Sequence, residues 1–267
     1  MNKSIVFAFI AATCMFYSCS NNSGSAENNS PVPAAEKELR DLIAAHPDSL
    51  LLKEKLIQYF RDNSNYGQAI AETDYALKKD SNNERLWYIK ATLLSENDDT
   101  LQAIKAWEKT IDLNPNPEYL LSLGTLYAFT KNPSALAVAD SLMLPGINAK
   151  NQALFIKGLY FNSTGDKMKA VNFFDTCISL DYTNMLAHRE KAICLYDLGK
   201  YLEGLKVLEL AVTVKKDYDE VYYWMGRCYE KLGLKKEAIQ NYQMALQLSP
   251  DYIEAKDALG KLGIKTP

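Results

Sequence analysis

The chain has 267 residues, of which 48% are hydrophobic and 24% are charged, as in an ordinary folded protein. Its 33 Asp and Glu residues slightly outnumber its 30 Lys and Arg residues. The chain therefore has no excess of positive charge that could attract phosphate groups, so the composition argues against a nucleic-acid-binding protein.

The first residues combine a positive charge with a short apolar run. Lys3 precedes the apolar stretch 5–17, which is shorter than the roughly 20 residues needed to cross a bilayer. This order is typical of a secretory signal peptide. The stretch ends in Phe16-Tyr17-Ser18-Cys19, and a small residue before a cysteine resembles the cleavage box of bacterial lipoproteins.

The lipoprotein resemblance implies that the signal peptide 1–18 is removed and that Cys19 carries the lipid. The family prefers Leu where this chain has Phe16, and Cys14 is a weaker alternative because its use would leave an apolar stub. An ordinary signal peptide cut nearby and an uncleaved anchor are the other interpretations. Several acyl chains would hold the protein on a membrane without a spanning helix.

Residues 19–33 are predicted to form a flexible tether. The segment 20–33 reads SNNSGSAENNSPVP and has too little apolar surface to fold. The residue after Cys19 is Ser20, whereas Asp there tends to retain Gram-negative lipoproteins at the inner membrane. The resemblance therefore implies an exported protein anchored in the outer membrane and facing the periplasm.

Small and bulky residues recur with a period of 34 through the rest of the chain. Counted from residues 151, 185 and 219, small residues occupy repeat positions 8, 15, 20 and 27, and a bulky residue occupies position 24. The small residues are Gly158, Ala192 and Gly226; Gly165, Gly199 and Gly233; Ala170, Gly204 and Ala238; and Cys177, Ala211 and Ala245. The bulky residues are Phe174, Leu208 and Tyr242. We expect two helices to approach closely at these positions.

This spacing resembles the tetratricopeptide repeat, a helix–turn–helix unit of 34 residues. The resemblance implies an all-α fold, a right-handed α-solenoid that occupies residues 34–267. The six expected repeats are 50–83, 84–116, 117–150, 151–184, 185–218 and 219–252. Residues 34–45 are predicted to be an N-terminal half repeat, and 253–263 a capping helix with a polar outer side.

The repeat 117–150 is the weakest of the six. Leu136 and Asp140 stand where the other repeats have a small and a bulky residue. Its second helix is expected over 134–144, because Pro145-Gly146 should end it.

The sequence predicts no enzyme, metal site or cofactor. Of the two histidines, His188 shares repeat position 4 with Trp87 and Tyr222 and is predicted to be a packed helix residue, and His46 lies at a helix end. No group of residues has metal-ligand spacing.

The three cysteines beyond the anchor are predicted to be buried thiols. Cys194 and Cys228 occupy one position in adjacent repeats, on helices expected to lie about 8–10 Å apart. A disulfide needs Cα atoms within about 7 Å. Cys177 replaces a packed Ala.

In the tetratricopeptide repeat family the first helix of each repeat lines a concave groove. Carried onto this chain, the groove positions hold arginines, aromatic residues and one asparagine: Arg85, Tyr88, Phe155, Asn162, Arg189, Tyr196, Tyr223 and Arg227. Arg and Tyr often dominate binding surfaces, so this set favours a peptide or helix that carries acidic groups. An average repeat surface with a few such residues is the alternative.

The family's clamp for chain-terminal carboxylates is not expected, because its Lys and Asn positions hold other residues, namely Glu54, Gln58, Tyr88 and Thr92. Three tripeptides resemble an acceptor for O-glycosylation in some periplasms, although Asp, Ser and Thr at helix starts are also expected as caps. They are Asp48-Ser49-Leu50, Asp99-Thr100-Leu101 and Asp140-Ser141-Leu142.

The expected function is that of a membrane-anchored scaffold for protein–protein interaction or for assembly of an envelope complex. Its plan is similar to that of pilus pilotins, barrel-assembly lipoproteins and adaptors of peptidoglycan enzymes. A groove that binds a small ligand or a cell-wall glycan is one alternative, and a homo-oligomeric structural module is another.

Overall fold

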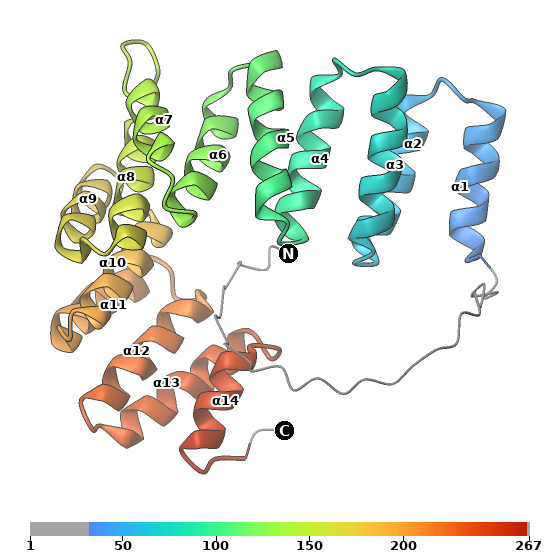
Figure 1. The fold of residues 1–267 in the computed structure, drawn as a ribbon. Helices are drawn as coiled ribbons and strands as arrows, with labels where there is room; N and C mark the ends of the chain where they lie inside the picture. The colour runs from blue at the N-terminus through green and yellow to red at the C-terminus, as the bar shows by residue number, and fades with distance from the viewer. Residues whose placement is uncertain (1–31, 266–267) are drawn as a thin grey trace, which may run out of the picture. The chain divides into compact units, whose positions relative to one another are not determined.

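The computed structural model describes residues 32–265, so the signal peptide 1–18, Cys19 and most of the tether lie outside the described residues. Within 32–265 the chain forms fourteen α-helices and no strand (Figure 1). Their bounds are α1 Ala34–Ala45, α2 Leu50–Asp62, α3 Tyr66–Lys79, α4 Glu84–Glu96, α5 Thr100–Leu113, α6 Pro117–Phe129, α7 Ser134–Leu142, α8 Lys150–Thr164, α9 Lys167–Leu180, α10 Met185–Asp197, α11 Tyr201–Val214, α12 Asp219–Lys231, α13 Lys235–Leu248 and α14 Ile253–Lys261. Over the same range, none of these helices has the length and apolarity of a membrane span.

The chain divides into two compact units, the first ending at Leu113 and the second beginning at Asn114. In the first unit, α1 to α5 pack in chain order, each helix against the next. In the second unit, α6 to α14 do the same, and in addition α6, α8, α10 and α12 pack against one another in sequence. This arrangement of paired helices confirms the predicted all-α repeat fold.

The predicted contact between repeat positions 8 and 24 is present. A Cβ atom at Gly226 would lie 2.6 Å from the ring of Tyr242, and one at Gly158 would lie 2.5 Å from the ring of Phe174. Both rings are fully buried. The bulky side chain of the second helix thus fills the space that the glycine of the first helix leaves open.

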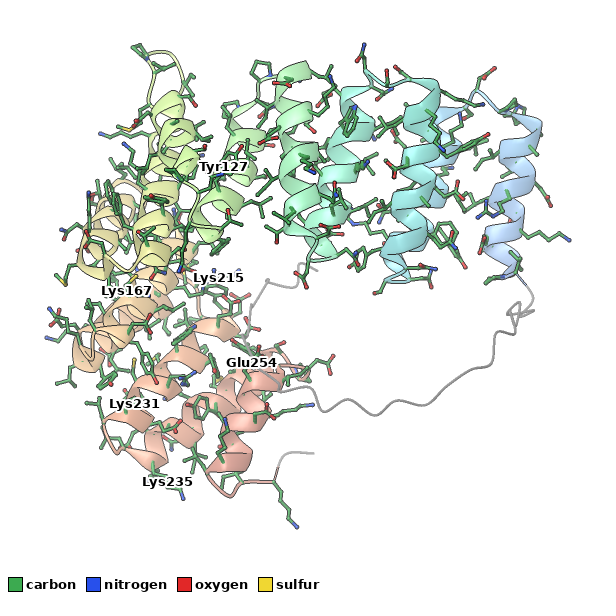
Figure 2. All side chains as sticks on the ribbon, in the orientation of Figure 1. Tyr127, Lys167, Lys215, Lys231, Lys235 and Glu254 are labelled. Atoms are coloured by element: carbon green, nitrogen blue, oxygen red, sulfur yellow. The ribbon has the colours of Figure 1, made fainter. Side chains whose placement is uncertain are left out.

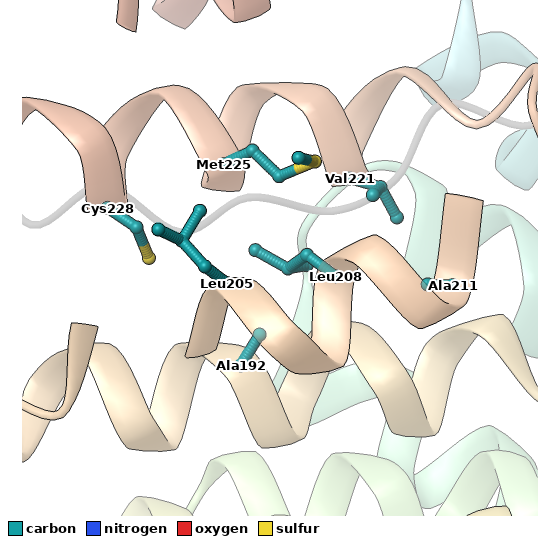
Figure 3. Packing of buried hydrophobic residues seen from close by; sticks show 7 residues of the cluster. All are labelled: Ala192, Leu205, Leu208, Ala211, Val221, Met225 and Cys228. Carbon is teal, nitrogen blue, oxygen red and sulfur yellow. The ribbon is translucent and has the colours of Figure 1, made fainter. Parts of the chain in front are cut away.

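A helix pair does not bury its apolar side chains alone. In Figure 3, Leu205 and Leu208 of α11 lie between Ala192 of α10 and the side chains of α12, among them Val221 and Met225. The core is therefore closed by the first helix of the following repeat. Because apolar burial contributes about 25 cal/mol per Å², this stacking is what stabilises each pair.

The expected alignment of α7 is wrong by one residue. Its buried side chains are Ala135, Ala139 and Leu142, whereas Leu136 is partly buried and Asp140 is exposed. Pro133 lies directly before the helix, which starts one repeat position later than α9 and α11 do. The inward positions of α7 lie one residue earlier in the repeat than those of α9 and α11. The helix also ends at Leu142, two residues earlier than expected.

Residues at repeat position 4 close the turn between successive repeats. In three repeats their side chains hydrogen-bond the backbone carbonyl six residues earlier. The pairs are Trp87 Nε1 with Ser81 at 2.8 Å, His188 Nε2 with Tyr182 at 3.0 Å, and Tyr222 Oη with Lys216 at 2.9 Å. We call these contacts the position-4 latches.

The position-4 latch explains why a histidine is buried at residue 188. Its ring is fully buried, which confirms the prediction of a packed helix residue. A carbonyl oxygen only accepts, so Nε2 carries the hydrogen, and Nδ1 has no partner in the described residues. Cys177, Cys194 and Cys228 are buried free thiols, as predicted.

Candidate functional site

The first helices of three successive pairs, α8, α10 and α12, lie side by side in the second unit. We call the surface that they form the first-helix face. Its three helices include six of the eight residues predicted to bind a partner, namely Phe155, Asn162, Arg189, Tyr196, Tyr223 and Arg227, and of these Phe155 and Tyr223 are buried. Arg85 and Tyr88 belong to α4 of the first unit.

Three of these residues meet around a single cation. Arg227 donates from Nη1 to the hydroxyl of Tyr223 at 2.9 Å and from Nη2 to the hydroxyl of Tyr196 at 3.0 Å. Tyr223 and Arg227 are four residues apart on α12 and therefore share a helix face, whereas Tyr196 comes from α10. The packing of α10 against α12 thus places Tyr196 beside Tyr223 and Arg227, which are distant from it in the sequence.

Aromatic rings surround the guanidinium of Arg227. Its Cζ atom lies 5.0 Å from the ring centroid of Tyr196, 5.4 Å from that of Trp224 and 5.8 Å from that of Tyr223. These distances are within the range of cation–π attraction. We call Arg227, Tyr196, Tyr223 and Trp224 the Arg227 cradle.

The cradle is held in place by further rings. Trp224 packs edge-on against Tyr196 and Tyr223, with centroid distances of 5.6 Å in both cases. Tyr252, which precedes α14, packs on Tyr223 at 5.1 Å. Edge-to-face and tilted pairs at such distances are favourable. The position of Arg227 is therefore fixed before any partner arrives.

The electrostatics of the cradle leave a net positive charge. Burial opposes the charged form of Arg227, but hydrogen bonds from its guanidinium to the hydroxyls of Tyr223 and Tyr196 outweigh it, so its pKa lies above the ordinary value. No carboxylate in residues 32–265 forms an ion pair with it. The charge is therefore present at every accessible pH and is not neutralised by the described chain.

Arg189, on the same face, differs from Arg227 in this respect. Its Nη2 lies 2.8 Å from Glu190 Oε1, and its Nη1 pairs with Glu220. The hydroxyl of Tyr218 donates to Glu220 at 2.7 Å. Only 17% of the Arg189 side chain is exposed, so its charge is satisfied inside the protein. Arg189 links α10 to α12 and offers little to a partner.

The remaining predicted residues of the second unit are not part of the cradle. Phe155 is buried against Phe174, with ring centroids 5.6 Å apart. The amide oxygen of Asn162 accepts at 2.6 Å from Nζ of Lys167, a residue labelled in Figure 2, and Lys167 also forms an ion pair with Asp197 at 2.6 Å. These side chains brace the α8–α9 pair.

In the first unit, Arg85 is exposed and its Nη2 lies 2.8 Å from Glu54 Oε2. Tyr88 is 40% exposed and packs edge-on against Trp107, with centroids 5.7 Å apart. A separate recess of about 440 Å³ lies between α1, α2 and α3. Arg40 lines it, but this guanidinium is paired with Glu72 at 3.0 Å and with Glu36 at 2.8 Å, so it offers no free charge.

Reasoning from the sequence missed Trp224, Tyr252 and Glu220. Trp224 is not at a groove position of the family, and Tyr252 precedes the capping helix, so neither position drew attention. Glu220 stands at a groove position, and its charge could have been matched to that of Arg189 one repeat earlier. In residues 32–265 no group of His, Cys, Asp or Glu residues is arranged to hold a metal ion.

Comparison with known proteins agrees with this architecture. Residues 219–252 match the tetratricopeptide repeat family model. A tetratricopeptide repeat protein from Parabacteroides merdae superposes with a TM-score of 0.72 at 20% identity, covering 86% of this chain and 91% of that one. PilW, described as a type IV pilus biogenesis factor, superposes with a TM-score of 0.60 at 18% identity, covering 78% of this chain and 97% of its own.

Two curated proteins show similar repeats in sequence. A TPR repeat-containing protein of Methanocaldococcus jannaschii is 23% identical over 209 residues, which is 74% of this chain and 36% of that protein. A DnaJ homolog subfamily C member 7 homolog of Dictyostelium discoideum is 24% identical over 221 residues, or 76% of this chain and 40% of its own length. The chain thus spans well under half of either relative. The fold suggests a scaffold for protein–protein interaction, and the chain, which carries a tetratricopeptide repeat at residues 219–252, is an all-α repeat protein with the fold of the tetratricopeptide repeat solenoids.

Proposed function

We propose that this protein is a membrane-anchored scaffold that holds a polypeptide partner against the first-helix face of its second unit. The observation that carries the proposal is the Arg227 cradle, in which a charged guanidinium is fixed among three aromatic rings without a carboxylate of its own. Arg, Tyr and Trp are the residue types in which the binding energy of protein interfaces is concentrated.

The rigidity of the cradle supports a binding role. Ordering a long side chain at an interface costs about 0.5–1.5 kcal/mol. Arg227 is already held by two hydrogen bonds and by packed rings, so a partner would not have to order it. More of the interaction energy is then available as affinity.

The anchored part of the proposal rests on the sequence. Cleavage before Cys19 and lipid attachment to its sulfur and amine would place the protein on the outer membrane, facing the periplasm. The fourteen residues 20–33 would then span about 20 Å on average as a flexible chain. This distance would let the folded units reach a partner near the membrane without being fixed to the surface.

Site-specific crosslinking tests the binding face. A photoreactive residue at Leu186, which lies in the first turn of α10 and is 47% exposed, should capture one specific protein in native membranes. The matched control is Leu202, at the start of the second helix α11 and 63% exposed. Equal yields from the two positions would reject the first-helix face as the binding surface.

The anchor is tested separately. Cys19→Ala should abolish labelling with a palmitate analogue and release the protein from the membrane fraction. The control is Cys14→Ala, which should change neither. Retention of both label and membrane association in the Cys19→Ala protein would remove lipidation at this residue from the proposal.

A further inference from the structure

We propose that the Arg227 cradle is a receptor for a carboxylate of the partner polypeptide. This inference rests on the proposed function, and it specifies the chemistry by which the partner is recognised at the first-helix face.

The first argument is the pairing of the arginines. The chain has five, all in the described part, and four of them form ion pairs with glutamates. The four are Arg40, Arg61, Arg85 and Arg189. Arg227 is the exception, and it is less exposed than Arg85, whose side chain is 67% exposed. A partly buried cation without an anion costs free energy, which a bound anion would recover.

The second argument is that the two acids of α12 that flank Arg227 in sequence are engaged elsewhere. Glu230, three residues further along α12, accepts a hydrogen bond from the hydroxyl of Tyr242 at 2.7 Å. Glu220 is held by Arg189 and Tyr218. The acids of α12 nearest in sequence to Arg227 are therefore committed to other partners.

The third argument is the supply of hydrogen-bond donors. A guanidinium has five N–H groups, and the tyrosine hydroxyls use two of them. Nε has no acceptor among the described residues, and it is not sealed from solvent. Tyr196 and Tyr223 accept from Arg227, so each hydroxyl keeps its own hydrogen for donation. The cradle thus presents several donors around one positive charge.

The free donors and the positive charge of the Arg227 cradle determine which kind of ligand it favours. A second cation is repelled, and a neutral amide would leave the charge unmatched. A carboxylate is planar, accepts at both oxygens and forms shorter and stronger hydrogen bonds with a guanidinium than a neutral acceptor does. The surrounding rings reduce competition from water, which strengthens the attraction further.

The test measures retention of degenerate nonapeptides on the full-length chain. Three acetylated pools are compared: an amidated pool with central Glu, an amidated pool with central Gln, and a pool with central Gln and a free C-terminal carboxylate. We expect at least one carboxylate pool to be retained about tenfold more than the amidated Gln pool. The pool that gains shows whether the carboxylate belongs to a side chain or to a chain end.

Variants assign the preference to the cradle. Arg227→Gln should abolish the preference for carboxylates, and Arg227→Lys should lose most of it, because an ammonium cannot reproduce the fork between Tyr196 and Tyr223. Arg61→Gln is the control: it replaces a partly exposed arginine of the first unit that is paired with Glu96, and it should leave the preference unchanged. Circular dichroism spectra and melting curves confirm that each variant is folded. A preference that survives in Arg227→Gln overturns the inference.

The outcomes separate this inference from the proposed function. If the pools are retained equally well, peptide binding stands and the carboxylate receptor is overturned. If no pool is retained above a blank surface, both are overturned.

The double variant Tyr196→Phe with Tyr223→Phe keeps the rings and removes the hydroxyls, and it should reduce the preference by about threefold. An unchanged preference would exclude the hydroxyls as donors.

Discussion

At the scale of single residues, the distance between the two helices of a pair depends on one missing side chain. Gly226 allows the Tyr242 ring to lie where a Cβ atom would otherwise be. Tyr242 is fully buried, and its hydroxyl reaches Glu230 at 2.7 Å at the edge of the pair. In this pair, the large side chain of α13 thus requires a glycine in α12.

Gly226→Ala should lower the free energy of unfolding by about 1–3 kcal/mol, because the added methyl group would lie 2.6 Å from a ring with no room to move. Urea denaturation measures the change. Gly260→Ala in α14 is the control, since no atom lies within 4 Å of its added Cβ. Alanine favours helix more than glycine does, so this control should be neutral or slightly stabilising.

These packing residues could be predicted from the sequence, whereas the cradle could be predicted only in part. The columns of small and bulky residues repeat, so Gly226 and Tyr242 stand out by position. The hydrogen bond between Arg227 and Tyr196 joins residues 31 apart on different helices. It depends on side-chain directions that no periodic column reports.

At the scale of helices and turns, the position-4 latches show how different residues do one task. Trp87, His188 and Tyr222 differ in size and chemistry, yet each donates to a carbonyl six residues earlier. The carbonyl belongs to the turn that precedes the helix. Each latch therefore fixes the turn between two repeats.

Tyr222→Phe should lower the free energy of unfolding by about 0.5–1.5 kcal/mol, because it removes the hydrogen bond to the Lys216 carbonyl and keeps the ring. The control is Tyr182→Phe, the same change at a side chain that is 69% exposed, where we expect a change within about 0.5 kcal/mol. Equal effects of the two changes in chemical denaturation would show that the latch contributes nothing.

The turns within the repeats were only half predictable. Gly165, Gly199 and Gly233 have positive φ angles of 98°, 74° and 75°. A Cβ atom at any of the three would meet no atom within 4 Å, so the expected close approach of helices is wrong at position 15, and the glycines serve the turn instead. The other three repeats place non-glycine residues with φ near 58° at the same position, namely Ser64, Asp98 and Lys131. Because Ser and Lys rarely adopt left-handed backbone and Asp does so only occasionally, the sequence did not reveal that all six turns have a positive φ angle at this position.

At the scale of the whole molecule, the period of 34 predicted the helical repeat fold but gave no sign of the division between Leu113 and Asn114. The repeat pattern continues across this boundary, so counting columns does not detect it. Pro115 and Pro117 lie just beyond it, but Pro115 also fits a repeat column. The three buried thiols all fall in the second unit.

The stability of that unit should fall in alkaline solution. Burial raises the pKa of the Cys177 and Cys194 thiols to about 12 and that of Cys228 to about 11. Thiols of the unfolded chain titrate near 8.5, so the folded state retains its protons to higher pH. Stability is unaffected below about pH 8.5 and decreases as the pH rises from there toward 11–12.

Urea denaturation at pH 8, 9 and 10 measures this decrease. Cys177→Ala removes one titrating group at a position where three other repeats have Ala, so its stability should decrease less steeply with pH. The Cys177→Ala variant is compared with the protein that keeps Cys177, and in both of them Cys14 and Cys19 are replaced by Ser. Parallel pH profiles for the two proteins would contradict the assignment to buried thiols.

The weak packing of α1 has a mechanical consequence. This helix buries none of its twelve residues fully, and it is the described helix next to the proposed tether. If the lipid holds one end and a partner holds the second unit, tension along the chain reaches α1 first. Its unwinding would lengthen that segment from about 18 Å to about 41 Å. The protein would then yield at its N-terminal helix, and the binding face would keep its shape under load.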